Sequence, residues 1–262
     1  MILAHPYHVV LPSPWPMASS IATINFMLTT ALSMHGYVPA SSNLLLITFL
    51  VLVVSIVLWL KDTVIEGSYL GDHTLLVRRG FGYGFNLFVL SEVLIFAAIF
   101  WAYLHSAMNP LIELGLSWAP ADIVNVQAME LPLLNTILLL SSGATVLLSH
   151  HKWINGDHKN STIAMAITAL LVVVFVLFQV VEYKLAQFTI TDGVFGSTFY
   201  AGTGLHGFHM ITLILMLSLV TFRMWRRTFS RTHSTNLDTT IIYSHVLDVI
   251  WLALFVVFYV WV

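Results

Sequence analysis

The chain has 262 residues, of which 58% are hydrophobic and only 8% charged, and its formal net charge is −2. A soluble domain carries about 25% charged residues, so a chain with this composition and a mean hydropathy of +0.90 cannot cover a water-facing surface. It is predicted to be an integral membrane protein. The absence of cysteine excludes disulfides, thiolate chemistry and iron–sulfur ligation, and the few scattered basic residues give no case for nucleic-acid binding.

Seven segments are apolar and long enough to cross a bilayer, which takes about 20 residues in a helix. The first is rich in Ser, Thr and Ala, which favours a side that faces protein but also fits a span that is only weakly hydrophobic. The fold class is therefore predicted to be all-α, with seven transmembrane helices in a single integral membrane domain (1–262). In chain order the predicted spans are 17–34, 44–60, 81–105, 132–149, 162–181, 198–222 and 239–261.

The positive residues orient these spans. Nine of the ten Lys and Arg residues, Arg231 among them, follow the second, fourth and sixth spans, whereas Lys184 alone lies on the other side. The positive-inside rule predicts that the N-terminus and those three connections lie on the inner side, and the C-terminus on the outer side. The outer connections carry acidic residues instead, including Glu113 and Asp122.

The connection after the second span, WLKDTVIEGSYLGDHTLLVRRG, is the most polar segment near a span end. It combines Lys61, Glu66 and His73 with further acidic and basic residues at the predicted inner interface. Two interpretations fit this composition. Basic residues at an interface can hold lipid phosphates, or the segment is a solvated helix end with local ion pairs.

The third span contains a carboxylate, Glu92, within the apolar run LFVLSEVLIFAAIFW. Glu92 lies about twelve residues from the start of its span. At 1.5 Å per residue this distance is about 18 Å, which places Glu92 near the middle of the bilayer. An ionisable residue there is a candidate functional group. Glu92 could be a neutral acid that loads and unloads a proton, a charged group paired with a neighbour, or a protonated side chain that only bonds across helices.

The sixth span places two histidines, His206 and His209, on one helical face in the sequence GLHGFHM. They could share a metal ion, one could ligate a haem, or both could be ring donors to carbonyls of a neighbouring helix. No third metal ligand occurs at local spacing. Gly204 and Gly207 indicate close helix packing around this face.

The seventh span carries His245 and Asp248, three residues apart on one helical face. Asp248 lies inside the span and should face protein or water rather than lipid. A His–Asp pair of this kind is either a proton relay or a satisfied structural hydrogen bond, and the sequence does not distinguish the two.

Several long motifs follow one another in the order of one known family. The N-terminal segment reads YHVVLPSPWP, the third span contains SEVLIFAAIFWAYLHSAM, and the fourth contains ELPLLNTILLLSSGATVLLSHH. The sixth span and the residues before it read FTITDGVFGSTFYAGTGLHGFHM, and the seventh contains HVLDVIWL. On these residues, almost from end to end, the chain resembles cytochrome c oxidase subunit III, the third core subunit of the mitochondrial haem–copper oxidase.

The resemblance implies a two-helix bundle, about residues 1–70, and a five-helix bundle, about residues 71–262, with a lipid-filled cleft between them. It also implies a non-redox core subunit that supports the catalytic subunit in reducing dioxygen to water with electrons from cytochrome c. That reaction is coupled to proton pumping in the respiratory chain, and the subunit would maintain proton uptake and stability. The chain would then be part of an enzyme while holding no redox centre itself.

The resemblance further implies that this chain binds no haem, copper or other metal. Phospholipids would fill the cleft, and haem a and copper would belong to partner subunits. The implied partners are catalytic subunit I, subunit II, accessory subunits and cytochrome c as the substrate of the complex, with membership of a respiratory supercomplex left open. The implied location is the mitochondrial inner membrane, with the N-terminus on the matrix side and the C-terminus on the intermembrane-space side.

At the level of residues, Glu92 matches the buried carboxylate of the family that reacts with a carbodiimide, and the resemblance implies no bond-making role for it. We expect it to be linked to proton supply. Positions associated with cleft lipids and inner headgroups are matched by Trp59, Lys61, Glu66, His73 and Arg223. A structural, lipid-related or relay role is implied for His206, His209, His245 and Asp248.

Two other functions fit a membrane chain with buried carboxylates and histidines. A proton-coupled transporter uses such groups, but it should show inverted repeats or helices broken by Gly or Pro in matching halves, and neither is visible in the sequence. A membrane haem protein needs histidines from two facing helices at matching depth and would show a Soret band in the isolated chain. Both remain alternatives to an oxidase subunit.

Overall fold

The computed structural model describes residues 6–9, 12–37, 39, 43–110, 118, 123–227 and 235–261. Seven helices in these ranges are long and apolar enough to cross a membrane, and no strand occurs among the described residues. The prediction of an all-α protein with seven spanning helices is confirmed. Three charged residues used to orient the spans, Glu113, Asp122 and Arg231, lie outside the described residues.

The helices match the predicted spans closely. Each predicted span lies within one helix, apart from Trp261 at the end of the seventh. Two π-helical segments, η1 (Glu66–Leu70) and η3 (Val256–Val260), continue α2 and α7. The helices are α1 (Trp15–Met34), α2 (Leu44–Ile65), α3 (Leu75–Met108), α4 (Leu131–Ile154), α5 (His158–Leu185), α6 (Gly193–Trp225) and α7 (Thr235–Phe255).

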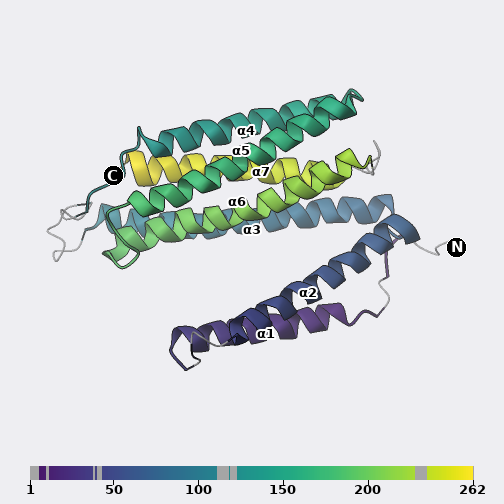
Figure 1. Ribbon diagram of the computed structural model, residues 1–262, viewed down its shortest axis with the longest axis horizontal. Coiled ribbons are helices and arrows are strands. Elements are labelled where there is room, and N and C mark those ends of the chain that lie inside the picture. Colours follow the sequence, from purple (N-terminus) through teal and green to yellow (C-terminus); the bar gives the residue numbers. More distant parts are fainter. Residues whose placement is uncertain are drawn as a thin grey trace. The chain divides into compact units, whose positions relative to one another are not determined.

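The chain divides into two compact units, Met1–Phe81 and Gly82–Val262. In the N-terminal unit α1 packs along α2 as a helical hairpin (Figure 1). The residues that α1 buries are Ser19, Ala22 and Thr29, and α2 buries only Ser55. Small and hydroxyl side chains let two helices approach closely in lipid, so the prediction that α1 has a protein-facing side is confirmed.

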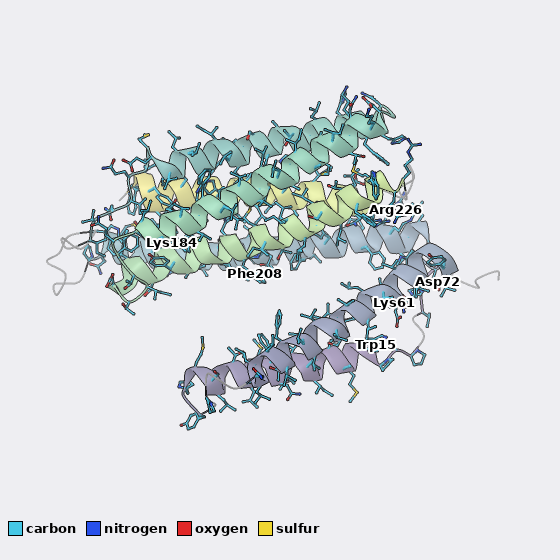
Figure 2. All side chains as sticks on the ribbon, in the orientation of Figure 1. Trp15, Lys61, Asp72, Lys184, Phe208 and Arg226 are labelled. Atoms are coloured by element: carbon cyan, nitrogen blue, oxygen red, sulfur yellow. The ribbon has the colours of Figure 1, made fainter. Side chains whose placement is uncertain are left out.

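The C-terminal unit is an antiparallel bundle in which α4, α5, α6 and α7 lie side by side (Figure 1). The α4–α5 pair has the most extensive contact. Lys184 and Arg226 lie at opposite ends of this bundle (Figure 2). At the end where α4 finishes and α7 begins, His150 Nε2 lies 3.7 Å from Asp238 Oδ1.

Helix α3 joins this bundle through large aromatic side chains. Tyr103 is fully buried, with its ring centroid 4.7 Å from that of Phe258 and 5.1 Å from that of Trp118. Closer to the middle of α3, the ring of Phe96 lies 5.5 Å from that of His209 on α6. The two Tyr103 contacts are edge-on and the Phe96 contact is tilted, and together they fix the position of α3 at a distance set by the rings.

Polar contacts hold the interior of the C-terminal unit together. Ser149 of α4 and Ser161 of α5 each donate a hydrogen bond to the backbone carbonyl of the other, at 2.8 and 2.7 Å. Trp251 of α7 is buried and donates from Nε1 to Thr136 Oγ1 of α4 at 3.0 Å. In lipid, where helices lack a hydrophobic driving force for association, such hydrogen bonds contribute together with van der Waals packing.

Two glycines give neighbouring groups the room they occupy. A Cβ on Gly202 of α6 would lie 3.0 Å from Phe258 and 3.2 Å from Leu254, and a Cβ on Gly143 of α4 would lie 2.8 Å from Asp248 Oδ2. A Cβ on Gly207 would meet nothing within 4 Å, and one on Gly204 only Tyr183 at 3.8 Å. The face that carries His206 and His209 is packed, since both side chains are buried, but this packing does not depend on Gly207, and the tight approach occurs five residues earlier, at Gly202.

Candidate functional site: a shared proton between two helices

The structure pairs Glu92 with His209. Glu92 lies midway along α3, His209 lies on α6, and Oε2 of Glu92 is 2.7 Å from Nε2 of His209. The Glu92 side chain is 18% exposed and that of His209 is 6% exposed. Because the two groups are so close and so buried, the proton between them belongs to the pair rather than to either residue alone.

The second nitrogen of the His209 ring fixes the proton count of this pair. Nδ1 lies 2.7 Å from the carbonyl oxygen of Leu205, and because a carbonyl only accepts, Nδ1 must donate its proton. When the ring is neutral, Nε2 is then an acceptor, and Glu92 must be protonated to donate to it. When the ring is cationic, Nε2 donates to a Glu92 carboxylate. Both forms hold one shared proton and carry no net charge.

Aromatic rings surround the pair. Phe96, one turn further along α3, and Phe208 and Tyr243 lie with their centroids 5.5, 6.0 and 6.4 Å from that of His209. Phe208 marks this level of α6 in Figure 2. Apolar walls strengthen a hydrogen bond by lowering the local dielectric, so these rings strengthen the bond between Glu92 and His209.

His206, one turn before His209, has a different role. Its ring is 1% exposed and donates from Nε2 to the carbonyl oxygen of Leu247 at 3.3 Å. The rings of Phe175 and Trp251 lie against it, with centroids at 5.8 and 5.3 Å. Of the alternatives left open by the sequence, a ring donor to a carbonyl of a neighbouring helix describes His206, and it is not among the described residues grouped as a candidate metal site.

The predicted pairing of His245 with Asp248 is present in α7. Nδ1 of His245 lies 3.4 Å from Oδ2 of Asp248, and the missing side chain of Gly143 makes the space for that oxygen. Within the described residues, Asp248 Oδ1 and His245 Nε2 are buried without a hydrogen-bond partner. Both interpretations of the pair, a proton relay and a structural hydrogen bond, therefore stay predictions.

The five residues matched to lipid positions fall into both units. Trp59, Lys61, Glu66 and His73 belong to the N-terminal unit, and Arg223 to the C-terminal unit. Trp59 and Lys61 are exposed at the end of α2, and Lys61 is labelled there in Figure 2.

Glu66 and His73 are half-buried and come together with His8. Oε2 of Glu66 lies 3.3 Å from Nε2 of His8, and the rings of His8 and His73 are 5.7 Å apart. Burial, and next the neighbouring His8, lower the pKa of His73. The connection after α2 therefore contains a compact cluster rather than a series of separate solvated side chains.

Sequence reasoning missed a second buried carboxylate, Glu182. It is 1% exposed near the end of α5, where Tyr259 and Gln179 both donate hydrogen bonds to its Oε1. Within the described residues Oε2 has no partner, and Glu182 lines a pocket of about 210 Å³ that also includes Glu130. The predicted fifth span ended at residue 181, so Glu182 was counted outside the membrane, whereas α5 continues to Leu185.

Comparison with known proteins gives the family. The family model for cytochrome c oxidase subunit III matches residues 5–262. Cytochrome c oxidase subunit 3 of Saccharomyces cerevisiae is 54% identical over 257 residues, which cover 98% of this chain and 95% of that protein. The subunits of Candida glabrata, at 53%, and Wickerhamomyces canadensis, at 54%, cover the same shares. With seven helices able to span a membrane and this similarity over almost its whole length, the chain belongs to the cytochrome c oxidase subunit III family.

Proposed function

We propose that this chain supports the catalytic subunit of cytochrome c oxidase as a non-redox core subunit, and that the Glu92–His209 pair helps to maintain proton uptake. The complex would reduce dioxygen to water with electrons from cytochrome c and pump protons, with haem a and copper held by partner subunits. The main partners are subunits I and II and accessory subunits. Membership of the family supports the role as a core subunit of the oxidase.

The observation that carries the proposed role in proton uptake is the 2.7 Å hydrogen bond between Glu92 and His209. A proton can move between the carboxyl oxygen and the ring nitrogen without changing the charge of the pair. An isolated charge in the middle of a bilayer is costly, so a pair that stays neutral in both forms can hold a proton there at low cost. Release of that proton alone would leave a charge of −1 on the pair, so we infer that the pair passes a proton on only as another one enters.

The test replaces Glu92 by Gln in the intact oxidase complex. The amide can still donate a hydrogen bond to Nε2 of His209, so the geometry is retained while the exchangeable proton is lost. We expect lower proton uptake and faster turnover-dependent inactivation at unchanged haem content. Oxygen consumption, proton release and activity against turnover number are the measurements.

Glu182→Gln is the matched control, because Glu182 is also a buried carboxylate but is bonded to Tyr259 and Gln179 rather than to a histidine. It should leave turnover-dependent inactivation unchanged. If Glu92→Gln behaves as the wild type in all three measurements, the proton-uptake role is wrong while membership of the complex stands.

We also propose that the helix ends that carry nine of the ten Lys and Arg residues lie on the matrix side of the mitochondrial inner membrane. At these ends the chain would bind phospholipid headgroups through Trp59, Lys61, Glu66, His73 and Arg223. The uneven distribution of the ten Lys and Arg residues supports this orientation, since Lys184 alone lies on the other side, at the opposite end of the C-terminal unit from Arg226 (Figure 2). The lipid-filled cleft and the division at about residue 70 remain part of the proposal. Loss of phospholipid from a Lys61→Gln complex, with Lys184→Gln as control, tests the lipid part by mass spectrometry.

Because the chain contains no cysteine, the orientation can be tested with single introduced cysteines. In mitoplasts, a membrane-impermeant maleimide added from outside should label a Lys184→Cys chain and leave a Lys159→Cys chain unlabelled. The reverse pattern would place the N-terminus in the intermembrane space.

A further inference from the structure

A second cluster of ionisable side chains lies in the N-terminal unit, at the end of α2. His8, Glu66 and His73 each offer one ligand atom, and these three atoms lie within 4.8 Å of one another. Figure 2 labels Asp72, the neighbour of His73, at this end of the hairpin. From this arrangement we propose that His8, Glu66 and His73 bind a divalent metal ion of the Zn²⁺ class.

The distances suit such an ion. Zn²⁺ binds imidazole nitrogen and carboxylate oxygen at about 2.0–2.2 Å in tetrahedral geometry, so two of its ligand atoms lie about 3.3–3.6 Å apart. The Nε2 atom of His8 and the Oε2 atom of Glu66 are 3.3 Å apart. All three ligand atoms lie within 4.8 Å of one another, so binding would draw the more distant atoms closer to the ion.

Three local features bring these residues together. Gly71 ends the π-helical segment in a left-handed conformation, with φ at 70°, which turns the chain so that His73 returns over Glu66. Thr74 donates from Oγ1 to the carbonyl oxygen of Pro6 at 2.6 Å, which ties the segment carrying His8 to the same turn. A Cβ on Gly67 would lie 2.6 Å from Nδ1 of His73, so the position of that ring depends on glycine there.

The donor set also matches the metal. Two histidines and one carboxylate occur in catalytic zinc sites, which leave the fourth position to water or another small ligand. The ring of Phe81 lies edge-on to that of His73, with centroids 5.0 Å apart, and gives the site one apolar wall. Glu66 and His73 are also among the proposed lipid residues, and a bound ion would offer its fourth position to a phosphate oxygen. The metal site does not depend on the role of Glu92.

The experiment measures bound zinc in the purified oxidase complex. The complex is treated with a chelator, dialysed against Zn²⁺ and analysed by inductively coupled plasma mass spectrometry. His8→Gln, Glu66→Gln and His73→Gln should each bind one Zn²⁺ fewer per complex than the wild type. His35→Gln, an exposed histidine at the end of α1 in the same unit, should bind as much as the wild type.

Gly67→Ala tests the geometry while keeping all three ligands. The added methyl group displaces the ring of His73, so we expect the zinc affinity of this site to fall by about 10- to 100-fold, as for changes that disturb the support of a ligand. An affinity equal to that of the wild type would contradict the placement of His73.

A footprint on the wild-type complex decides the proposal even if variants assemble poorly. Diethylpyrocarbonate modifies accessible histidine rings, and peptide mass spectrometry identifies them. Zn²⁺ should protect His8 and His73 but not His35. Equal zinc content in the wild type and the three ligand variants, or modification of His8 and His73 that Zn²⁺ leaves unchanged, would overturn the proposal.

Discussion

The two units of this protein bury their surfaces in different ways. Helix α2, in the N-terminal unit, has a mean hydropathy of 2.7 in its most apolar window, yet only 6% of that window is buried. The segment Thr235–Val260, in the C-terminal unit, has a lower value of 2.2, and 50% of its window is buried. Because lipid is as apolar as Leu, hydropathy identifies a span but does not tell which spans are interior.

What distinguishes the interior is polarity. Buried polar residues of the C-terminal unit that bond across helices include Ser149, Thr168 and His206, whereas the polar side chains buried in the described part of the N-terminal hairpin are small hydroxyls. A polar group facing hydrocarbon without a partner is costly, so polar residues in spans collect where another helix can satisfy them. The stability of the C-terminal unit should therefore depend on close contacts at particular atoms, and that of the hairpin on what covers its apolar surface.

The largest effect on stability should come from adding a methyl group at Gly196, where the neighbouring backbone leaves no room for a side chain. A Cβ on Gly196 would lie 2.2 Å from the backbone oxygen of Thr189, which cannot rotate away. We expect Gly196→Ala to destabilise the C-terminal unit by more than about 3 kcal/mol and to reduce the amount of this chain in the purified complex. Gly207→Ala on the same helix, where a Cβ meets nothing within 4 Å, is the control. Similar yields and thermal midpoints for the two variants would show that packing at Gly196 is not limiting.

A smaller effect should follow from removing one interhelical polar contact. Ser161→Ala loses the hydrogen bond to the carbonyl oxygen of Ser149, and such bonds in membranes contribute about 0.6 kcal/mol, with a maximum near 1.7. Ser141→Ala removes a bond within α4 only, to the carbonyl oxygen of Leu138, and should cost less. The measurement is the thermal midpoint of the complex with each variant. Equal midpoints would contradict the expectation that a hydrogen bond between helices contributes more stability than one within a helix.

The sequence predicted the elements of the fold well and their contacts poorly. Hydropathy located all seven helices, because crossing a bilayer is a local property of about 20 residues. It could not pair Glu92 with His209, which are 117 positions apart. Nor could it tell Gly202, which faces Phe258, from Gly207, which faces open space.

The candidate site shows the same limit. Glu92 was found because a carboxylate in an apolar run stands out, whereas Glu182 was missed because it lies one residue beyond the predicted end of its span. The sequence did contain an indication of this buried polar site, since Gln179 and Glu182 are three residues apart and lie on one face of the helix. His8 could not have been linked to Glu66 and His73, since the contact depends on a turn at Gly71 and a hydrogen bond from Thr74 to Pro6.

The smallest effect belongs to the partly exposed turn between α4 and α5, where the contact is local to the start of one helix. Asp157 caps α5: it accepts hydrogen bonds from the Asn160 side chain at 2.7 Å and the Asn160 backbone at 3.3 Å, and these bonds lower the pKa of Asp157 below 3.8. A lowered pKa in the folded state means that this contribution is fully present above 3.8 and is lost as pH falls through the folded-state value.

Hydrogen exchange of the amide of Asn160 measures this contribution locally. Asp157→Ala should reduce protection of that amide at neutral pH, because the cap is lost. Asp157→Asn keeps an acceptor oxygen and should restore most of the protection while removing its dependence on pH. The advantage of the wild type over Asp157→Ala should then shrink only below 3.8. If it shrinks near neutral pH instead, a different group controls the turn, and His158, the next residue, is the first to examine by the same substitution and measurement.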